Sequence, residues 1–173
     1  AKAGELRAMG KDVISFSVGE PDFETPEHIK KAAIKAIEDG FTRYTPVPGI
    51  PELRQAICDK LKNDNNLDYT PAQIVVSTGA KQSLSNVLLA VLDEGDEAII
   101  PSPYWLSYSA MVNIAGGKCV FVNTKKENSF MITREELEKA LTPKTKVLFL
   151  TSPSNPTGMV YSEKQLREVA DFA

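Results

Sequence analysis

Polar residues held between prolines follow an apolar run near the C-terminal end of the sequence. Residues 147–150 are Val-Leu-Phe-Leu, and residues 151–158 (TSPSNPTG) place Asn155 among hydroxyls, two prolines and a glycine. Proline fixes its own φ and restricts the residue before it, so Pro153 and Pro156 limit the freedom of Asn155. In α/β proteins, ligands bind at the carboxyl ends of parallel strands. The pattern predicts that the Asn155 amide hydrogen-bonds a ligand, with an ordinary strand-to-helix turn as the alternative.

A glycine turn upstream is the second candidate for chemistry. Residues 78–82 (TGAKQ) follow the apolar run 74–77 and open a helical pattern. Such a turn offers free backbone N–H groups and the positive end of a helix dipole to a phosphate. Lys81 opposes that dipole, so we expect its charge to face an anion. The residues match neither the Gly-x-Gly-x-x-Gly nor the Walker pattern, and a simple glycine turn is the alternative.

An aromatic residue marks a third strand end. Residues 99–105 (IIPSPYW) end in Trp105, the single tryptophan of the chain. An aromatic plate at a sheet edge can stack on a flat heterocycle. The alternative is that Trp105 packs into the core. This alternative is disfavoured if the phosphate turn and the Asn155 loop lie at the same sheet edge.

Five motifs, taken in order, resemble one known family. They are residues 17–23 (SVGEPDF), 44–54 (YTPVPGIPELR), 78–82 (TGAKQ), 101–105 (PSPYW) and 152–158 (SPSNPTG). The chain resembles the pyridoxal-phosphate-dependent aminotransferases of fold type I, class I/II. The resemblance covers nearly all of the chain, and it is closest to the bacterial aspartate/prephenate aminotransferase branch.

The resemblance implies a role for each residue of the cofactor site. Gly79, Ala80 and Lys81 would hold the phosphate of pyridoxal phosphate, and Trp105 would stack on its pyridine ring. Asn155 would hydrogen-bond the phenolic oxygen of that ring. The resemblance also implies cis peptide bonds at Ser102–Pro103 and Asn155–Pro156, and we expect Gly79, Ala80, Trp105 and Asn155 to surround one cavity.

The same resemblance implies substrate and dimer contacts. Gly19, Trp105 and Asn155 would contact the substrate, with Gly19 offering backbone where a side chain would intrude. Tyr44 would cross the interface of a homodimer to reach the phosphate of the partner subunit. The partners expected are thus an amino acid, a 2-oxo acid and a second copy of the protein.

The implied activity is transamination between an amino acid, aspartate or a related acidic one, and a 2-oxo acid. Two other classes share these cofactor loops. One is a different pyridoxal-phosphate enzyme of fold type I, such as a carbon–sulfur lyase. The other is a regulator that carries an aminotransferase-like domain. A cofactor-free structural domain is disfavoured, because three ligand-type loops fall at strand ends.

Three functional residues of the family lie downstream of the Asn-Pro-Thr-Gly motif. They are the lysine that carries the cofactor, the aspartate that pairs with the pyridinium nitrogen and the arginine that grips the substrate α-carboxylate. We therefore expect this chain to be a fragment of a longer enzyme, with no catalytic residue of its own and no activity by itself. Lys81 is assigned to phosphate and Lys164 to the solvated face of the last helix.

Composition indicates which kinds of partner and which cellular compartment to expect. The formal net charge is −3 and the isoelectric point is near 5.3, which disfavours a nucleic-acid surface. The sequence has no apolar run of membrane-spanning length, so we expect no membrane partner and a cytoplasmic protein. Cys58 and Cys119 are expected to be buried, reduced thiols, and His28 a solvated residue at a helix start. We expect no metal site.

Alternating strands and helices predict the fold class. We expect an α/β fold, a mostly parallel sheet with flanking helices that forms part of the large domain of this family and is incomplete at both ends. Residues 1–25 are expected to be an N-terminal segment, and residues 26–173 a partial pyridoxal-phosphate-binding large domain. Strands are expected near 74–77, 97–100, 118–122 and 146–150.

Four helices are expected besides the one that follows the glycine turn at 78–82. One spans 26–39 with Thr25 as N-cap and an apolar face that includes Ile29 and Ile37. A second spans 51–63 with four apolar residues inward: Leu53, Ala56, Ile57 and Leu61. Two capping boxes, Thr133 to Glu136 and Ser162 to Gln165, predict two further helix starts.

Overall fold

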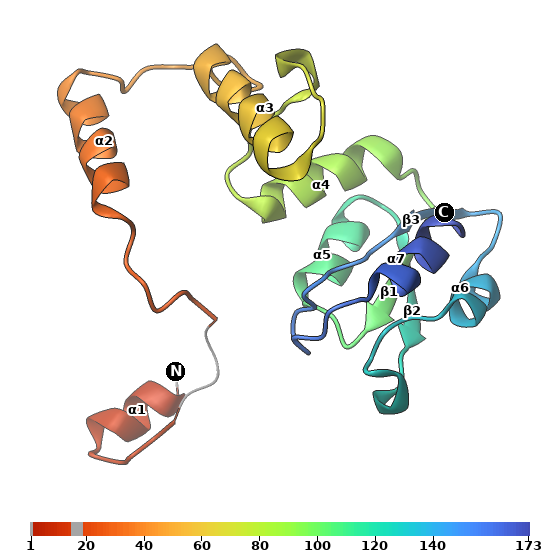
Figure 1. Cartoon of the computed structure of the whole chain (residues 1–173). Coiled ribbons are helices and arrows are strands. Elements are labelled where there is room, and N and C mark those ends of the chain that lie inside the picture. Colours follow the sequence, from red (N-terminus) through yellow and green to blue (C-terminus); the bar gives the residue numbers. More distant parts are fainter. Residues whose placement is uncertain (1, 15–18) are drawn as a thin grey trace. The chain divides into compact units, whose positions relative to one another are not determined.

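The computed structural model describes residues 2–14 and 19–173 (Figure 1). Packing contacts divide the chain into two units, residues 1–45 and residues 46–173. The division at residue 45 groups residues by their packing contacts and does not test where a domain begins. The domain boundary expected after residue 25 therefore stays a prediction.

The first unit contains two helices, α1 (Lys2–Ala8) and α2 (Glu27–Glu38), and neither has a buried residue. The helix expected at 26–39 is confirmed, but its expected N-cap is wrong. Pro26 is the N-cap residue, with extended backbone, and no side chain caps the helix. The apolar face expected for α2 is exposed within this unit: Ile37 is 67% exposed. His28 is exposed, as expected.

The second unit is built on a parallel sheet of three strands, β1 (Glu97–Ser102), β2 (Lys118–Asn123) and β3 (Thr145–Leu148). Their order is β2-β1-β3, and both pairings are parallel. The α/β fold class with a parallel sheet is therefore confirmed. Because all three strands run the same way, the loops that follow them leave from one edge of the sheet.

The strand expected at 74–77 is not a strand in the structure. Its residues alternate in burial, with Ile74 8% exposed and Val75 65% exposed. The backbone N–H of Val76 donates to the carbonyl of Pro48 at 2.9 Å, so its partner is a loop. Gly49 allows this approach, since a Cβ there would lie 2.5 Å from Cγ2 of Val76.

Five α-helices belong to the second unit: α3 (Pro51–Asn65), α4 (Ala80–Val91), α5 (Ser107–Ile114), α6 (Arg134–Ala140) and α7 (Glu163–Ala170). Two short 3-10 helices, Pro71–Gln73 and Lys126–Asn128, lie in its loops. Both predicted capping boxes are confirmed. The side chains of Thr133 and Ser162 accept from the backbone N–H of Glu136 and Gln165, respectively.

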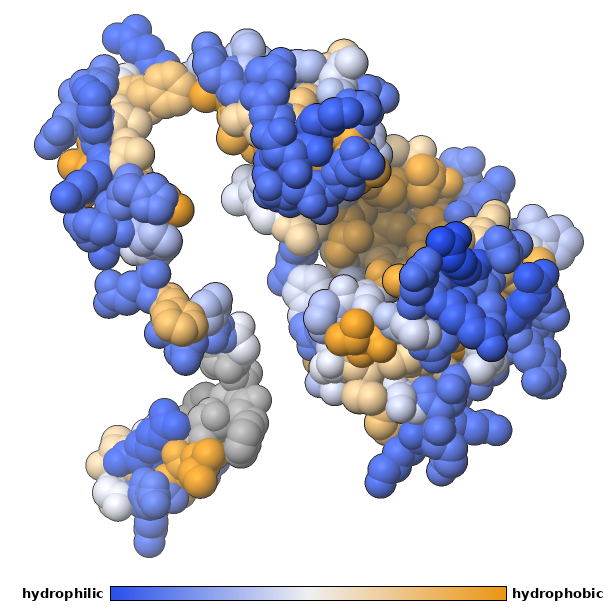
Figure 2. Space-filling view, in the orientation of Figure 1, coloured by the Kyte–Doolittle hydropathy of each residue, from blue (hydrophilic) through white to orange (hydrophobic). Residues whose placement is uncertain are grey.

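The sheet has a separate hydrophobic cluster on each face. Ala98 and Ile100 of β1 belong to the first cluster, which includes buried residues of α4 and α5. Ile99, between them, belongs to the second cluster, which includes buried residues of α6 and α7. This alternation is expected for a strand buried on both faces. In Figure 2, hydrophilic residues cover the outer surfaces of α6 and α7.

The inward face predicted for α3 is partly wrong. Leu53 is 42% exposed and Ala56 is exposed, whereas Ile57 and Leu61 are half-buried and Cys58 is only 5% exposed. The packed side of this helix is thus rotated toward Cys58. Cys58 is a buried free thiol as expected, and Cys119 in β2 is free and half-buried.

A buried acid lies at the opposite edge of the sheet from the strand-end loops. Glu97 is 6% exposed and accepts from the Thr142 hydroxyl at 2.6 Å. Lys118, the β2 residue paired with it, lies 3.5 Å away. The hydrogen bond from Thr142, followed by the charge of Lys118, holds the pKa of Glu97 below its ordinary value despite burial. Glu97 therefore ties the starts of the strands together.

Within residues 2–14 and 19–173, none of the helices has the length and apolar character needed to cross a membrane.

Candidate functional site

The turn before α4 has the geometry of an anion-binding loop. Gly79 is the N-cap of α4, with φ 78° and ψ 167°. No atom would meet an added Cβ there, so glycine is needed for the backbone conformation and not for space. The N–H of Gly79 itself donates to the carbonyl of Ser77 at 2.8 Å. Gly79 thus shapes the turn, and its own donor is already in use.

The next two residues supply the free donors. The N–H groups of Gln82 and Ser83 bond to the carbonyl of Gly79. Among the hydrogen bonds of the described residues, none uses the N–H of Ala80 or of Lys81. These two amides lie at the positive end of the α4 dipole and can both donate to an anion. Lys81 is exposed and adds a full charge beside them.

The structure brings Lys81 and Trp105 together. Nζ of Lys81 lies over the ring of Trp105, 5.0 Å from its centroid. Trp105 follows β1 and is half-buried against the first hydrophobic cluster. A cation from the start of α4 and an aromatic ring from the loop after β1 therefore meet in one place, as the phosphate and the ring of a phosphorylated heterocycle require.

Two residues that the sequence did not single out link Trp105 to the Asn155 loop. Tyr108 of α5 makes an edge contact with Trp105, with ring centroids 5.6 Å apart and an interplanar angle of 90°. Its hydroxyl lies 2.7 Å from Oγ1 of Thr151. Sequence spacing gives no signal for this pair, because 43 residues separate its members.

The Asn155 loop is closed by its own hydrogen bonds. Ser154 N–H donates to the carbonyl of Met159 at 2.8 Å, and Gly158 N–H donates to the carbonyl of Ser154 at 2.7 Å. Asn155 lies between these bonds and is exposed. The bonds Ser102–Pro103 and Asn155–Pro156 are cis, as predicted, and Ser152–Pro153 is also cis.

A small cavity lies beside Asn155. Its volume is about 20 Å³, which is room for roughly one water molecule. It is lined mainly by aromatic residues and by polar residues of the Asn155 loop, including Tyr104, Tyr108, Phe130, Phe149, Thr151 and Asn155. Gly79, Ala80 and Trp105 do not line it, so the prediction that they share one cavity with Asn155 is not met. Tyr108, which lines this cavity together with Asn155, is the residue of the lining that contacts Trp105.

Tyr161 forms part of the same cavity wall and anchors the far end of the Asn155 loop. Its hydroxyl accepts from the backbone N–H of Ile132 at 3.0 Å, and its own N–H donates to Oγ of Ser152 at 3.2 Å. Burial raises the pKa of the Tyr161 phenol.

Two predicted site residues lie in the first unit. Gly19 is exposed, and no atom lies within 4 Å of the position a Cβ would take. Tyr44 is fully exposed. Their assigned contacts with substrate and with the partner subunit stay predictions.

Comparison with protein families matches residues 11–173 to aminotransferase class I and II. The chain belongs to this family. An aspartate/prephenate aminotransferase of Nitrosomonas europaea is 53% identical over 167 residues, which are 96% of this chain and 42% of that protein. The aspartate aminotransferase of Bacillus subtilis is 50% identical over 171 residues, 99% of this chain and 44% of that protein. The chain therefore spans less than half the length of these relatives.

A solved structure agrees with the fold described above. The aspartate aminotransferase of Thermus thermophilus with maleate superposes with a TM-score of 0.93 at 48% sequence identity. The match covers 99% of this chain and 45% of that one. The predicted resemblance to class I/II aminotransferases and the predicted fold class are thus confirmed.

The residues present fit the cofactor that the family implies. The two amides of Ala80 and Lys81, together with the Lys81 ammonium, fit a phosphate, because all three are donors carried by the first two residues of α4. The half-buried Trp105 ring matches a flat aromatic ring. Asn155 carries a side-chain amide, which can donate to a ring oxygen.

Proposed function

We propose that this chain supplies the pyridoxal-phosphate-binding part of an aminotransferase. The observation that carries the proposal is the position of Lys81 over Trp105, 5.0 Å from the ring centroid, at the N-terminus of α4. That arrangement pairs an anion site with an aromatic plate. Family membership over residues 11–173 supports the same conclusion.

Each residue has a defined task in this proposal. Ala80 and Lys81 bind the phosphate, and Gly79 holds the turn in the conformation that exposes their N–H groups. Trp105 orients the ring by stacking, and Asn155 donates a hydrogen bond to the ring oxygen. Pyridoxal phosphate, when bound, supplies an electron sink for the electron pair left at the α-carbon of an amino acid.

The proposed substrates are aspartate, or a related acidic amino acid, and a 2-oxo acid. The support comes from relatives: the Bacillus subtilis protein is an aspartate aminotransferase, and the Thermus thermophilus enzyme was solved with maleate, a dicarboxylate. Gly19, Trp105 and Asn155 are proposed to contact this substrate. Asn155 and Gly19 are exposed, so both are open to a small molecule.

The assembly proposed is a homodimer in the cytoplasm. Tyr44 is proposed to reach the cofactor phosphate of the partner subunit, and its full exposure leaves it available for such a contact. The two free cysteines fit a reducing compartment. The segment 1–25 is proposed to join the rest of the protein to the large domain that begins at residue 26.

Amino-group transfer is the direct test. The protein that carries this chain should move the amino group of aspartate to 2-oxoglutarate, and Trp105→Ala should lower that rate while Lys164→Ala, on the solvated face of α7, leaves it unchanged. Release of a thiol from a cysteine-type substrate would favour a carbon–sulfur lyase instead. Cofactor binding with neither reaction would favour a regulator.

A chemical test addresses the attachment of the cofactor. Borohydride reduction of the loaded protein should fix a pyridoxyl group on a lysine, and peptide mapping identifies it. We expect no such group on any lysine between Lys2 and Lys164. A pyridoxyl group on Lys81 would contradict its assignment to phosphate.

A further inference from the structure

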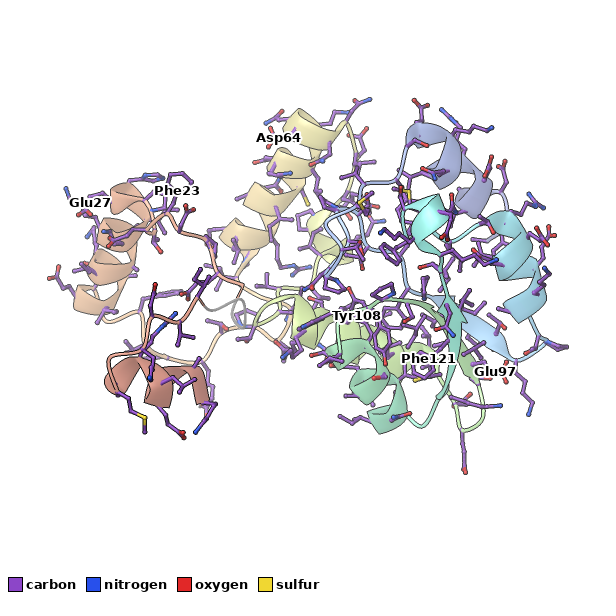
Figure 3. All side chains as sticks on the ribbon, turned by 90° about the horizontal axis from the view of Figure 1, so that it is seen from below. Phe23, Glu27, Asp64, Glu97, Tyr108 and Phe121 are labelled. Atoms are coloured by element: carbon purple, nitrogen blue, oxygen red, sulfur yellow. The ribbon has the colours of Figure 1, made fainter. Side chains whose placement is uncertain are left out.

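Tyr108 contacts both halves of the proposed ring site. It is the second residue of α5 and is 8% exposed. Its ring stands edge-on to Trp105, and its backbone N–H donates to the carbonyl of Trp105 at 3.0 Å. Its ring also stacks on that of Phe149, with ring centroids 4.6 Å apart. Figure 3 shows Tyr108 on α5, directed into the packed interior of its unit.

The hydroxyl of Tyr108 reaches the loop that carries Asn155. It lies 2.7 Å from Oγ1 of Thr151, which follows β3 and begins that loop. In the proposed site, Trp105 contacts the face of the cofactor ring, and Asn155 contacts the oxygen of that ring. Tyr108 therefore joins the stacking side of the site to the hydrogen-bonding side by one side chain.

We propose that Tyr108 is a positioning residue for pyridoxal phosphate: its ring sets the plane of Trp105, and its hydroxyl sets Thr151 and hence the start of the Asn155 loop. The proposal rests on the proposed function. It goes beyond a core-packing role, because packing alone needs the ring of Tyr108 and not its hydroxyl. Tyr108→Phe separates the two, since it keeps the contacts with Trp105 and Phe149 and removes only the bond to Thr151.

The ring contact is tested without cofactor. Trp105 is the only tryptophan of the 173 residues, so the fluorescence of this chain reports on that side chain alone. Tyr108→Leu keeps apolar volume but removes the edge contact. We expect its Trp105 emission to shift to the red and its acrylamide quenching to increase, while Tyr108→Phe keeps the parent values. Identical emission and quenching in Tyr108→Leu would overturn the role of the ring.

The hydroxyl contact is tested by a double-mutant cycle. Pyridoxal phosphate is titrated into the parent chain, Tyr108→Phe, Thr151→Val and the double variant, and quenching of Trp105 gives each affinity. Loss of this one part-buried hydrogen bond should weaken binding about 2- to 10-fold in each single variant. Because both changes remove the same bond, the double variant should lose no more than one single variant. Ser109→Ala, on the same helix but outside the Trp105–Thr151 link, is the control and should bind like the parent.

The outcomes separate this inference from the proposed function. If the parent chain fails to bind pyridoxal phosphate, both the positioning role of Tyr108 and the proposed function are contradicted. In a second outcome, the parent chain binds pyridoxal phosphate, and Tyr108→Phe and Thr151→Val bind it equally well but have lower unfolding midpoints. That result would contradict only the positioning role and would leave Tyr108 as a core residue. Additive losses in the double variant would also overturn it, because the two hydroxyls would then act separately. Thr151→Val keeps the test valid if Tyr108→Phe does not fold.

Discussion

At the ring end of the proposed site (Trp105, Tyr108, Phe149 and Thr151), Tyr108 and Phe149 belong to the hydrophobic core and are each 8% exposed, and Trp105 packs against that core. At the phosphate end (residues 78–82), every residue is exposed, and the turn is held by backbone bonds and by the bond from Thr78 N–H to the Gln82 side chain. The ring end is therefore built by packing, and the phosphate end by backbone conformation. Changes at the first should alter stability and binding together, whereas changes at the second should alter binding alone.

The largest effect is expected from Phe149→Ala at the ring end. The variant removes a buried ring that stacks on Tyr108, so the free energy of unfolding should fall by about 3–5 kcal/mol. Urea unfolding measures it. Phe121→Ala is the control, because Phe121 is 49% exposed and stacks on Tyr104 at the β2 surface. An equal fall in the free energy of unfolding in the two variants would show that Phe149 contributes no more to the core than an exposed ring does.

At the phosphate end, Lys81→Ala should weaken binding without unfolding the chain. Loss of a charge-assisted contact of about 1.5–3 kcal/mol corresponds to a roughly 10- to 100-fold lower affinity for pyridoxal phosphate. Because Lys81 is exposed, the free energy of unfolding should change by less than about 0.5 kcal/mol. Lys164→Ala, at another exposed position on α7, should change neither quantity. A large loss of stability in Lys81→Ala would remove the contrast between the two ends.

A helix cap that belongs to neither the ring end nor the phosphate end shows what a loss of stability alone does to binding. Thr133→Ala removes the acceptor for Glu136 N–H at the start of α6 and should lower the free energy of unfolding by about 0.5–2 kcal/mol. Its affinity for pyridoxal phosphate should equal that of the parent. Ser85→Ala is the matched hydroxyl control, because the Ser85 hydroxyl donates to the carbonyl of Lys81 within α4 and caps no helix end, and it should cost less stability than Thr133→Ala. Altered affinity in Thr133→Ala would mean that any loss of stability disturbs the site.

The smallest effect concerns pH and Glu97. Its pKa in the folded chain is lowered, first by the hydrogen bond from Thr142. The resulting stability is present above the ordinary glutamate pKa of 4.5 and is lost as pH falls through the lower pKa of the folded state. The stability difference between the parent and Glu97→Gln should therefore shrink as pH falls below 4.5. Unfolding midpoints measured across this range check it, and a constant difference would contradict it.

Local signals in the sequence predicted local structure well. Both capping boxes are confirmed, because each depends on residues three positions apart. The strands at 97–100, 118–122 and 146–150 were found within a few residues, because each is a short apolar run. Thr25 failed as an N-cap because Pro26 already supplies the extended residue that precedes the helix.

Long-range partners were not predictable in the same way. Residues 74–77 have the composition of a strand, but the N–H of Val76 finds its acceptor in Pro48, far away in the sequence. The link from Tyr108 to Thr151 is another such contact, and neither residue type marks it. Gly79 was identified correctly as the turn residue at the start of α4, yet only the structure shows that its N–H is already used by Ser77.

The account depends on pyridoxal phosphate binding across Trp105, and fluorescence titration of this chain tests that directly. Because Trp105 is the single tryptophan, its emission should be quenched saturably by one equivalent of pyridoxal phosphate, after correction with tryptophanamide. Pyridoxal without the phosphate should bind far more weakly, and Lys81→Ala should lose most of the difference between the two compounds. Absence of saturable quenching, or equal quenching by pyridoxal and pyridoxal phosphate, would contradict the assignment of the site.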